Sequence, residues 1–110
     1  PMVTVTVSQP GASPTQLAAE VTRRVEDQVA TLTNVKRLSS SVTEGVSTTA
    51  IEFQLDHDLA TALDDTRDAV TRIRGDLPQD IQEPIISKVD IGGSLMSYAV
   101  VAPNMSPDEL

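Results

Sequence analysis

Residues 58–77 carry the longest uninterrupted helical period in the chain. Their apolar positions recur at steps of three and four, the spacing that aligns side chains on one face of a helix. Asp58 can accept hydrogen bonds from the free N–H groups of a first turn, and Pro78 is a stop signal. We therefore predict a helix of about 20 residues, or ~30 Å. Its predicted buried stripe is Leu59, Leu63, Thr66, Val70, Ile73 and Leu77.

The opposite face of this predicted helix is charged, with acids in its first half and bases in its second half. That order complements the helix dipole, and it sets Asp68 four residues before Arg72, a spacing suited to an ion pair. One face thus suits a protein core, and the other suits water or a neighbouring protein. The charged set is Asp64, Asp65, Asp68, Arg72 and Arg74.

Four other segments show the alternation of apolar and polar residues that is typical of strands. A short turn containing Gly45 joins the second and third of them, which indicates an antiparallel hairpin. On this hairpin we expect Ile51, Phe53 and Leu55 to share one face. The predicted strands are residues 2–8, 35–42, 46–55 and 84–91.

A second helix is predicted between the first two strands. Gly11 can adopt a positive φ in the preceding turn, Ser13 can cap the helix, and Pro14 suits its first position. The helix is expected to run to about Leu32, with charged residues on its solvated face. Its predicted buried stripe is Leu17, Val21, Val25, Val29 and Leu32.

The order strand, helix, strand, strand, helix, strand predicts an α+β fold of the ferredoxin-like, split βαβ type (βαββαβ). Right-handed crossovers place both helices on one face of a four-stranded antiparallel sheet. The other face is left uncovered, and its expected residues are small and mainly polar. They are Thr4, Thr6, Arg37, Ser39, Ser41, Thr48, Ala50, Glu52 and Ser87.

Residues 3–17 and 96–110 align without gaps, and both copies show a strand, a turn and a capped helix start. We interpret this repeat as a duplication. Residues 1–92 then form one ferredoxin-like unit and residues 93–110 the first strand of a similar second unit, with Gly92 and Gly93 between them. Both chain ends are expected to be cuts within a longer protein. The matching pairs are Val7 and Val100, Pro10 and Pro103, Ser13 and Ser106, Pro14 and Pro107, and Leu17 and Leu110.

Composition excludes several functions. The chain has no cysteine and one histidine, His57, so thiolate chemistry is excluded and a metal site has little support. The net charge of −8, with one Phe and one Tyr, argues against a nucleic-acid partner. Adjacent Asp64 and Asp65 lie about 100° apart on a helix, so they do not pair for acid/base catalysis. Capping accounts for Ser13, which has no identifiable base. We expect no enzyme activity, cofactor or metal.

A series of short motifs follows one order along nearly the whole chain. In that order and spacing they resemble the porter region of resistance-nodulation-division efflux transporters, specifically the hydrophobe and amphiphile exporters, or acriflavine resistance proteins, of bacteria. The motifs are Pro10-Gly11-Ala12-Ser13-Pro14, Glu20-Val21-Thr22, Val25-Glu26, Ser39, Ser41, Gly45, Phe53, Asp58-Leu59, Ala62, Asp65, Asp68, Val70, Leu77-Pro78, Pro84, Ile86 and Lys88.

The resemblance implies the periplasmic portion of a bacterial inner-membrane protein, with a complete first porter subdomain and the start of the second. It implies proton-driven multidrug efflux of amphiphilic small molecules, a role in antibiotic resistance, and a homotrimer that works with a periplasmic adaptor and an outer-membrane channel. Helix 58–77 would stand at the trimer centre. The open sheet face, with Thr6, Thr48 and Ser87, would border the substrate path.

Plainer alternatives stay open for each of these expectations. The charged helix face can serve solubility, and the open sheet face can be an ordinary solvated surface. The fold also hosts unrelated functions, so the chain can instead be an autonomous regulatory, small-ligand-binding or acyl-phosphate-hydrolysing domain. The hydrolase needs a phosphate-cradling loop with an arginine, and residues 9–13 offer no basic side chain.

Overall fold

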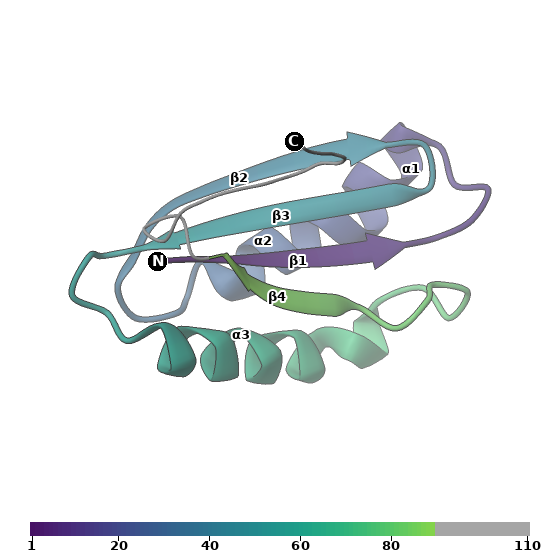
Figure 1. Ribbon diagram of the computed structural model, residues 1–110. Helices are drawn as coiled ribbons and strands as arrows, with labels where there is room; N and C mark the ends of the chain where they lie inside the picture. Colours follow the sequence, from purple (N-terminus) through teal and green to yellow (C-terminus); the bar gives the residue numbers. More distant parts are fainter. Residues whose placement is uncertain (90–110) are drawn as a thin grey trace, which may run out of the picture.

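The computed structural model describes residues 1–89 of the 110-residue chain. Their order is βαββαβ, because α1, a π-helical turn η1 and α2 follow one another as a single helical segment (Figure 1). The predicted ferredoxin-like α+β fold is therefore confirmed. The elements are β1 (Met2–Ser8), α1 (Pro14–Leu17), η1 (Ala18–Thr22), α2 (Arg23–Val29), β2 (Val35–Thr43), β3 (Val46–Phe53), α3 (Leu59–Ile73), a 3-10 turn η2 (Arg74–Asp76) and β4 (Ile85–Val89).

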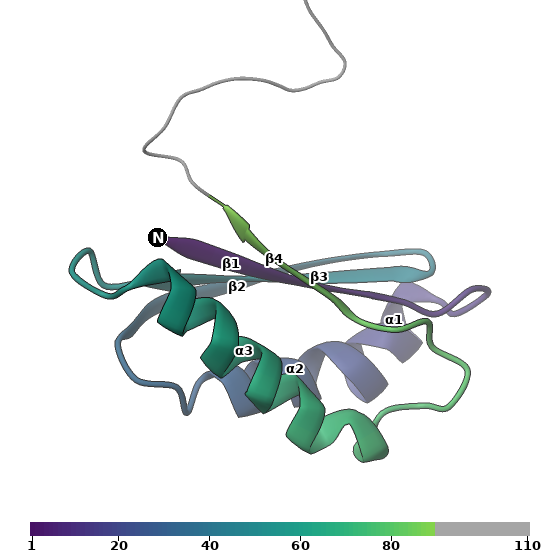
Figure 2. The same cartoon turned by 60° about the horizontal axis from the view of Figure 1, so that its bottom comes forward.

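The four strands form one antiparallel sheet in the order β2-β3-β1-β4. The helices lie on one face of this sheet, and within residues 1–89 the other face is uncovered (Figure 2). Strands β2 and β4 are the two edges. The core lies between the sheet and the helices, and the predicted helix-one stripe is fully buried in it as far as Val29. Its largest fully buried apolar side chains are Phe53, Leu17, Ile51, Val3, Val5, Val7, Val21, Val25 and Val29.

Local signals in the sequence set the starts of both helical segments. The Ser13 hydroxyl accepts a hydrogen bond from the Gln16 N–H at 3.2 Å, with Pro14 at the first helical position. The Asp58 carboxylate accepts from both the N–H and the hydroxyl of Thr61, at 3.0 and 2.9 Å. Both predicted caps are therefore confirmed, as is the positive φ of Gly11, which is 84°.

The ends of the elements were predicted less well. The first helix ends at Val29, short of Leu32, and the following loop contains Asn34 with a positive φ of 67°. Strand β3 ends at Phe53, and the His57 N–H then donates to the Gln54 carbonyl at 3.0 Å, which closes a turn over residues 54–57. The prediction that Leu55 shares the face of Ile51 and Phe53 is therefore wrong, and Leu55 is 87% exposed.

The predicted stripe of α3 is confirmed in part, because Thr66 and Val70 are buried and Leu77 is buried just beyond the helix, but alanines that were not predicted share the buried face. Its fully buried side chains include the small residues Ala62 and Ala69, whereas Leu59 and Leu63 are only half-buried at its flank. Buried Thr66 is satisfied locally, because its hydroxyl donates to the Ala62 carbonyl at 2.7 Å. Helix α3 thus turns its alanines to the core. The α-helix ends at Ile73, and η2 continues it to Asp76.

Several predictions fall outside the described residues. These are the second half of the repeat at 96–110, the second unit at 93–110, and the last two residues of the predicted strand 84–91. Among the helices that the structure does describe, none has the length and apolar character needed to cross a membrane.

Candidate functional site

The uncovered side of the sheet, here called the open face, presents outward side chains from all four strands. Strand pairing sets Thr6 on β1 directly opposite Thr48 on β3, and Thr4 opposite Ser87 on β4. The structure thus brings Thr6 and Thr48 together, while Ser87 lies beyond β1 and one row away. The two central rows are Ser41, Thr48, Thr6 and Ile85, then Ser39, Ala50, Thr4 and Ser87.

The centre of the open face is small, mainly hydroxylic and uncharged, as predicted. Charge enters at one end, where a β-bulge between Val35 and Arg37 brings two bases beside Glu52. Lys36 Nζ and Arg37 Nε lie 3.9 and 3.6 Å from its carboxylate oxygens. These partly exposed pairs add little stability. They mark a charged end beside a neutral centre.

Sequence reasoning missed Ile85 on the open face. Its pairing with Thr6 places it in the central row, and its side chain is 61% exposed. The signal was present, because Ile85 lies two residues before Ser87 and alternation puts both on one face. Ile86 points the other way and packs against the core.

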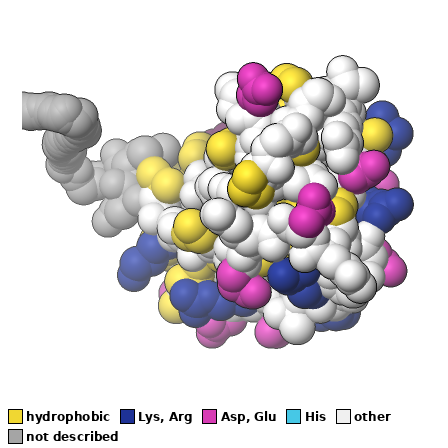
Figure 3. Space-filling model, turned by 90° about the vertical axis from the view of Figure 1, so that its right-hand side faces the viewer, with side chains coloured by type: hydrophobic (Ala, Val, Ile, Leu, Met, Phe, Trp, Pro, Cys, Tyr) yellow, Lys and Arg dark blue, Asp and Glu magenta, His cyan; other side chains and the backbone are white. Residues whose placement is uncertain are grey.

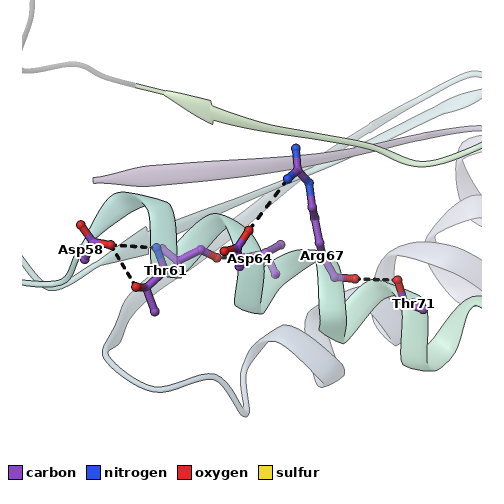
Figure 4. A network of polar contacts seen from close by, with 7 residues as sticks. Asp58, Thr61, Asp64, Arg67 and Thr71 are labelled. Carbon is purple, nitrogen blue, oxygen red and sulfur yellow. Dashed lines mark hydrogen bonds and ion pairs between the residues drawn. The ribbon is translucent and has the colours of Figure 1, made fainter.

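The second candidate surface is the outer face of α3, formed by the exposed side chains of Asp64, Asp68 and Arg72. The expected pair of Asp68 with Arg72 is not among the ion pairs within residues 1–89. Instead Arg67 Nη1 lies 3.9 Å from Asp64 Oδ1, an i,i+3 pair (Figure 4). Positions three apart on a helix are neighbours as much as those four apart, so the observed pair is as compatible with the helix as the expected one.

Asp65 and Arg74 depart from this outer face. Asp65 is half-buried, and Arg74 lies in η2, also half-buried, with its Nη2 3.7 Å from Glu83 Oε1. Two residues correspond to a turn of about 200° on a helix, so Arg74 faces away from Arg72 and toward β4. The charged set predicted for one face is therefore divided between different sides of the helix.

The α3 side of the molecule carries charges of both signs. Figure 3 shows acidic and basic side chains next to one another along its lower edge, the side on which α3 lies in Figure 1. Hydrophobic side chains on this face occur among polar ones without forming one large patch. A mixed surface of this kind does not create a strong field of one sign.

The start of α3 has one clear electrostatic perturbation. The hydrogen bonds from the Thr61 hydroxyl and then its N–H lower the pKa of Asp58 below its ordinary value, and nearby His57 lowers that pKa slightly further. Both hydrogen bonds favour the charged carboxylate, which explains the direction. This group therefore serves as a cap.

His57 has a structural role that sequence reasoning did not find. Its ring stacks on Phe53 with centroids 5.1 Å apart, and its Nδ1 lies 3.0 Å from the side-chain amide nitrogen of Asn34, within hydrogen-bond distance. The contact ties the loop before α3 to the loop before β2. Within residues 1–89 no three His, Cys, Asp or Glu side chains are grouped so as to hold a metal ion.

Comparison with known proteins decides the family. The family model described as the AcrB/AcrD/AcrF family matches residues 1–110, which is the whole chain. The chain belongs to the AcrB/AcrD/AcrF family. The resemblance of its motifs to resistance-nodulation-division transporters is thereby confirmed.

Two relatives of this AcrB-family chain show how much of a whole protein it represents. The swarming motility protein SwrC of Bacillus subtilis is 32% identical over 109 residues, covering 99% of this chain and 10% of the relative. An uncharacterized transporter of Haemophilus influenzae is 32% identical over 95 residues, which cover 86% of this chain and 9% of that relative. The chain thus spans about a tenth of the length of these relatives.

Proposed function

We propose that this chain is a noncatalytic, periplasmic porter module of a proton-driven multidrug efflux transporter, and that its open face forms part of the wall of the substrate path. The observation that carries the proposal is the pairing of Thr6 with Thr48 at the centre of a neutral, uncovered face in a chain of this family. The substrates are amphiphilic small molecules.

The chemistry of the open face suits a path along which many compounds move. Hydroxyl groups and the Ala50 methyl group offer weak contacts of several kinds, so no single compound is held tightly. Aromatic anchoring must come from outside the open face, because Phe53, the only Phe, Tyr or Trp within residues 1–89, is buried and stacked on His57. The face would then guide a substrate that other surfaces bind.

The outer face of α3 is proposed to meet its symmetry copies in a homotrimer. Asp68 and Arg72 are exposed and make no ion pair within residues 1–89, so both remain available to a second copy. Mixed charges at such a contact can pair in one arrangement and separate in another at small cost. A periplasmic adaptor and an outer-membrane channel would complete the assembly.

The substrate-path proposal is tested by Thr48→Trp in the full-length transporter. A bulky ring at the centre of the open face should change which compounds are exported, without changing the amount or stability of the trimer. Thr33→Trp is the matched control, since Thr33 is exposed in the loop before β2. If Thr48→Trp affects every compound equally, or none, the open face has no direct role in recognition.

A further inference from the structure

A groove between the C-terminal half of α3 and the start of β4 adjoins the open face at Ile85, and its lining does not include Thr6, Thr48 or Ser87. Its volume is about 520 Å³, which lies within the range of small-molecule sites. Helix α3 and η2 supply one wall and the chain entering β4 supplies the other. The residues that decide its chemistry are Arg67, Val70, Arg74, Glu83, Ile85 and Ile86.

The apolar part of this α3–β4 groove comes from both walls. Val70 is buried at its base, Ile86 is half-buried, and Pro84 lies beside them. Ile85 is one of two large hydrophobic side chains that are strongly exposed within residues 1–89. An exposed isoleucine that borders other aliphatic side chains extends their surface, and so offers room for an aliphatic chain.

Two guanidinium groups flank this apolar part. Arg67 and Arg74 are seven residues apart, close to two helical turns, so they lie on one side of the helix about 10 Å apart along its axis. Figure 4 shows the Arg67 side chain extending from α3 toward the sheet. The two arginines can therefore approach one ligand from the same wall.

Both arginines keep hydrogen-bond donors for a ligand. Their nearest carboxylate oxygens, on Asp64 and Glu83, are 3.9 and 3.7 Å away, beyond hydrogen-bond distance. A guanidinium carries five N–H donors, and within residues 1–89 neither group donates a side-chain hydrogen bond. Exposed ion pairs at such distances are weak, so an oxyanion that makes direct hydrogen bonds to a guanidinium can displace the carboxylate from it.

The positive character distinguishes this groove from a second groove within residues 1–89. The second groove, between α2 and the end of α3, is lined by Arg24 with Asp27 and Asp76, and Arg24 already donates to the Asp76 carbonyl. That lining is net negative, as is the whole chain at −8. The α3–β4 groove has two arginines and one glutamate, and is net positive. The sign of its charge selects an anion.

We propose that the α3–β4 groove binds an amphiphile with an aliphatic body and an anionic head group, such as a carboxylate, sulfonate or sulfate. The body lies on Val70, Ile85 and Ile86. The head group is held mainly by Arg74, the less exposed arginine, with Arg67 as second partner. Glu83 competes with the ligand for Arg74. This binding does not depend on the proposed transport role.

The test is titration of the 110-residue chain with decyl sulfate below its micelle concentration, followed by calorimetry and methyl NMR. Saturable shifts are expected at Val70, Ile85 and Ile86. Decyltrimethylammonium, with the same chain and the opposite charge, should bind about tenfold more weakly, because it meets two guanidinium groups. Arg74→Gln should weaken decyl sulfate binding by about fivefold or more.

Two further variants separate direct binding from charge in general. Arg72→Gln removes the same charge from the same helix on a side facing away from the groove, and should change the affinity by less than about twofold. Glu83→Gln should strengthen binding by about two- to fivefold, because it removes the competing carboxylate. Glu83 is highly exposed, so this second substitution leaves the fold intact even if Arg74→Gln does not.

Three results would overturn the proposal. Equal affinity for the sulfate and the ammonium compound would show that charge is not recognised. Equal losses of decyl sulfate affinity for Arg72→Gln and Arg74→Gln would mean that both arginines act only through the long-range electrostatic field of the chain. Methyl shifts at Thr48 and Ala50 as large as those at Val70, or weaker binding by Glu83→Gln, would place the ligand outside the groove.

Discussion

Thr22 in η1 and Ser47 on β3 form a hydrogen bond of 2.6 Å between their hydroxyl oxygens, inside the layer where the helices pack on the sheet. Both side chains are buried, so each hydroxyl depends on the other for its partner. Adjacent Val21 and Thr22 in this π-helical turn are both buried. This polar contact therefore fixes how the first helical segment sits on β3.

Removing one of these two hydroxyl groups should destabilise the fold. Ser47→Ala leaves the Thr22 hydroxyl buried without its partner, which costs about 1–3 kcal/mol in the free energy of unfolding. Thr22→Val combined with Ser47→Ala should cost less than the sum of the two single changes, because no unpaired hydroxyl remains. Urea unfolding of the unaltered chain, the two single variants and the double variant measures this coupling. Additive losses of unfolding free energy would contradict it.

The corrected position of Leu55 gives a second prediction. Leu55→Ala should change the free energy of unfolding by less than about 0.5 kcal/mol, because the side chain is exposed beyond the end of β3. Phe53→Ala, two residues earlier and buried, should cost about 3–5 kcal/mol. A large loss for Leu55→Ala in urea unfolding would mean that it packs in the core after all.

Stability should depend on the protonation of Asp58 in acid. Its folded-state pKa is lowered by Thr61, so the cap stabilises the fold above the ordinary aspartate pKa of 3.8 and is lost as pH falls through the lower folded-state pKa. Asp58→Asn retains a capping oxygen without the charge. The difference in unfolding free energy between this variant and the unaltered chain should therefore shrink as pH falls below 3.8.

Asp27→Asn provides the control for that titration. Asp27 is exposed on α2 and accepts no side-chain hydrogen bond within residues 1–89. The substitution Asp27→Asn therefore removes an equal charge without removing a helix cap. If both variants lose the same pH dependence, net charge accounts for the effect and the cap does not.

The outer face of α3 can be tested by exchanging its charges in the full-length transporter. Asp68→Arg with Arg72→Asp should reduce trimer assembly or export, because the carboxylate introduced by Arg72→Asp would then meet unaltered acidic side chains of neighbouring copies, such as Asp64. Arg23→Asp with Asp27→Arg is the matched exchange on exposed positions of α2. It is a cleaner control than one using Glu26, which accepts a hydrogen bond from Ser40 at 2.6 Å. If the two exchanges change trimer assembly and export equally, the charges on the outer face of α3 serve only solubility.

The fold could be predicted because local signals and periodicity agreed. Ser13 and Asp58 mark helix starts chemically, and the valines of β1 mark its buried face. The buried stripe of α3 was less accessible to prediction. Alanine and leucine positions share helical spacing, and only the position of the sheet determines that Ala62 and Ala69 face it while Leu63 lies at the flank.

The candidate sites show a similar limit. Alternation placed Thr6, Thr48 and Ser87 on one face, but it did not predict that Thr6 and Thr48 are direct neighbours, because that depends on strand register. The pairing of Arg74 with Glu83 joins η2 to the chain before β4, and no local pattern encodes such a contact. The α3–β4 groove depends on this tertiary arrangement as well.

The most direct measurement of the central claim is the labelling of Thr48→Cys in the full-length transporter. The chain contains no cysteine, so a background with the other cysteines replaced reports this position alone. If the open face borders the substrate path, exported compounds should slow maleimide labelling of Thr48→Cys and leave Thr33→Cys unaffected. Labelling of Thr48→Cys at the same rate with and without every exported compound would contradict the claim.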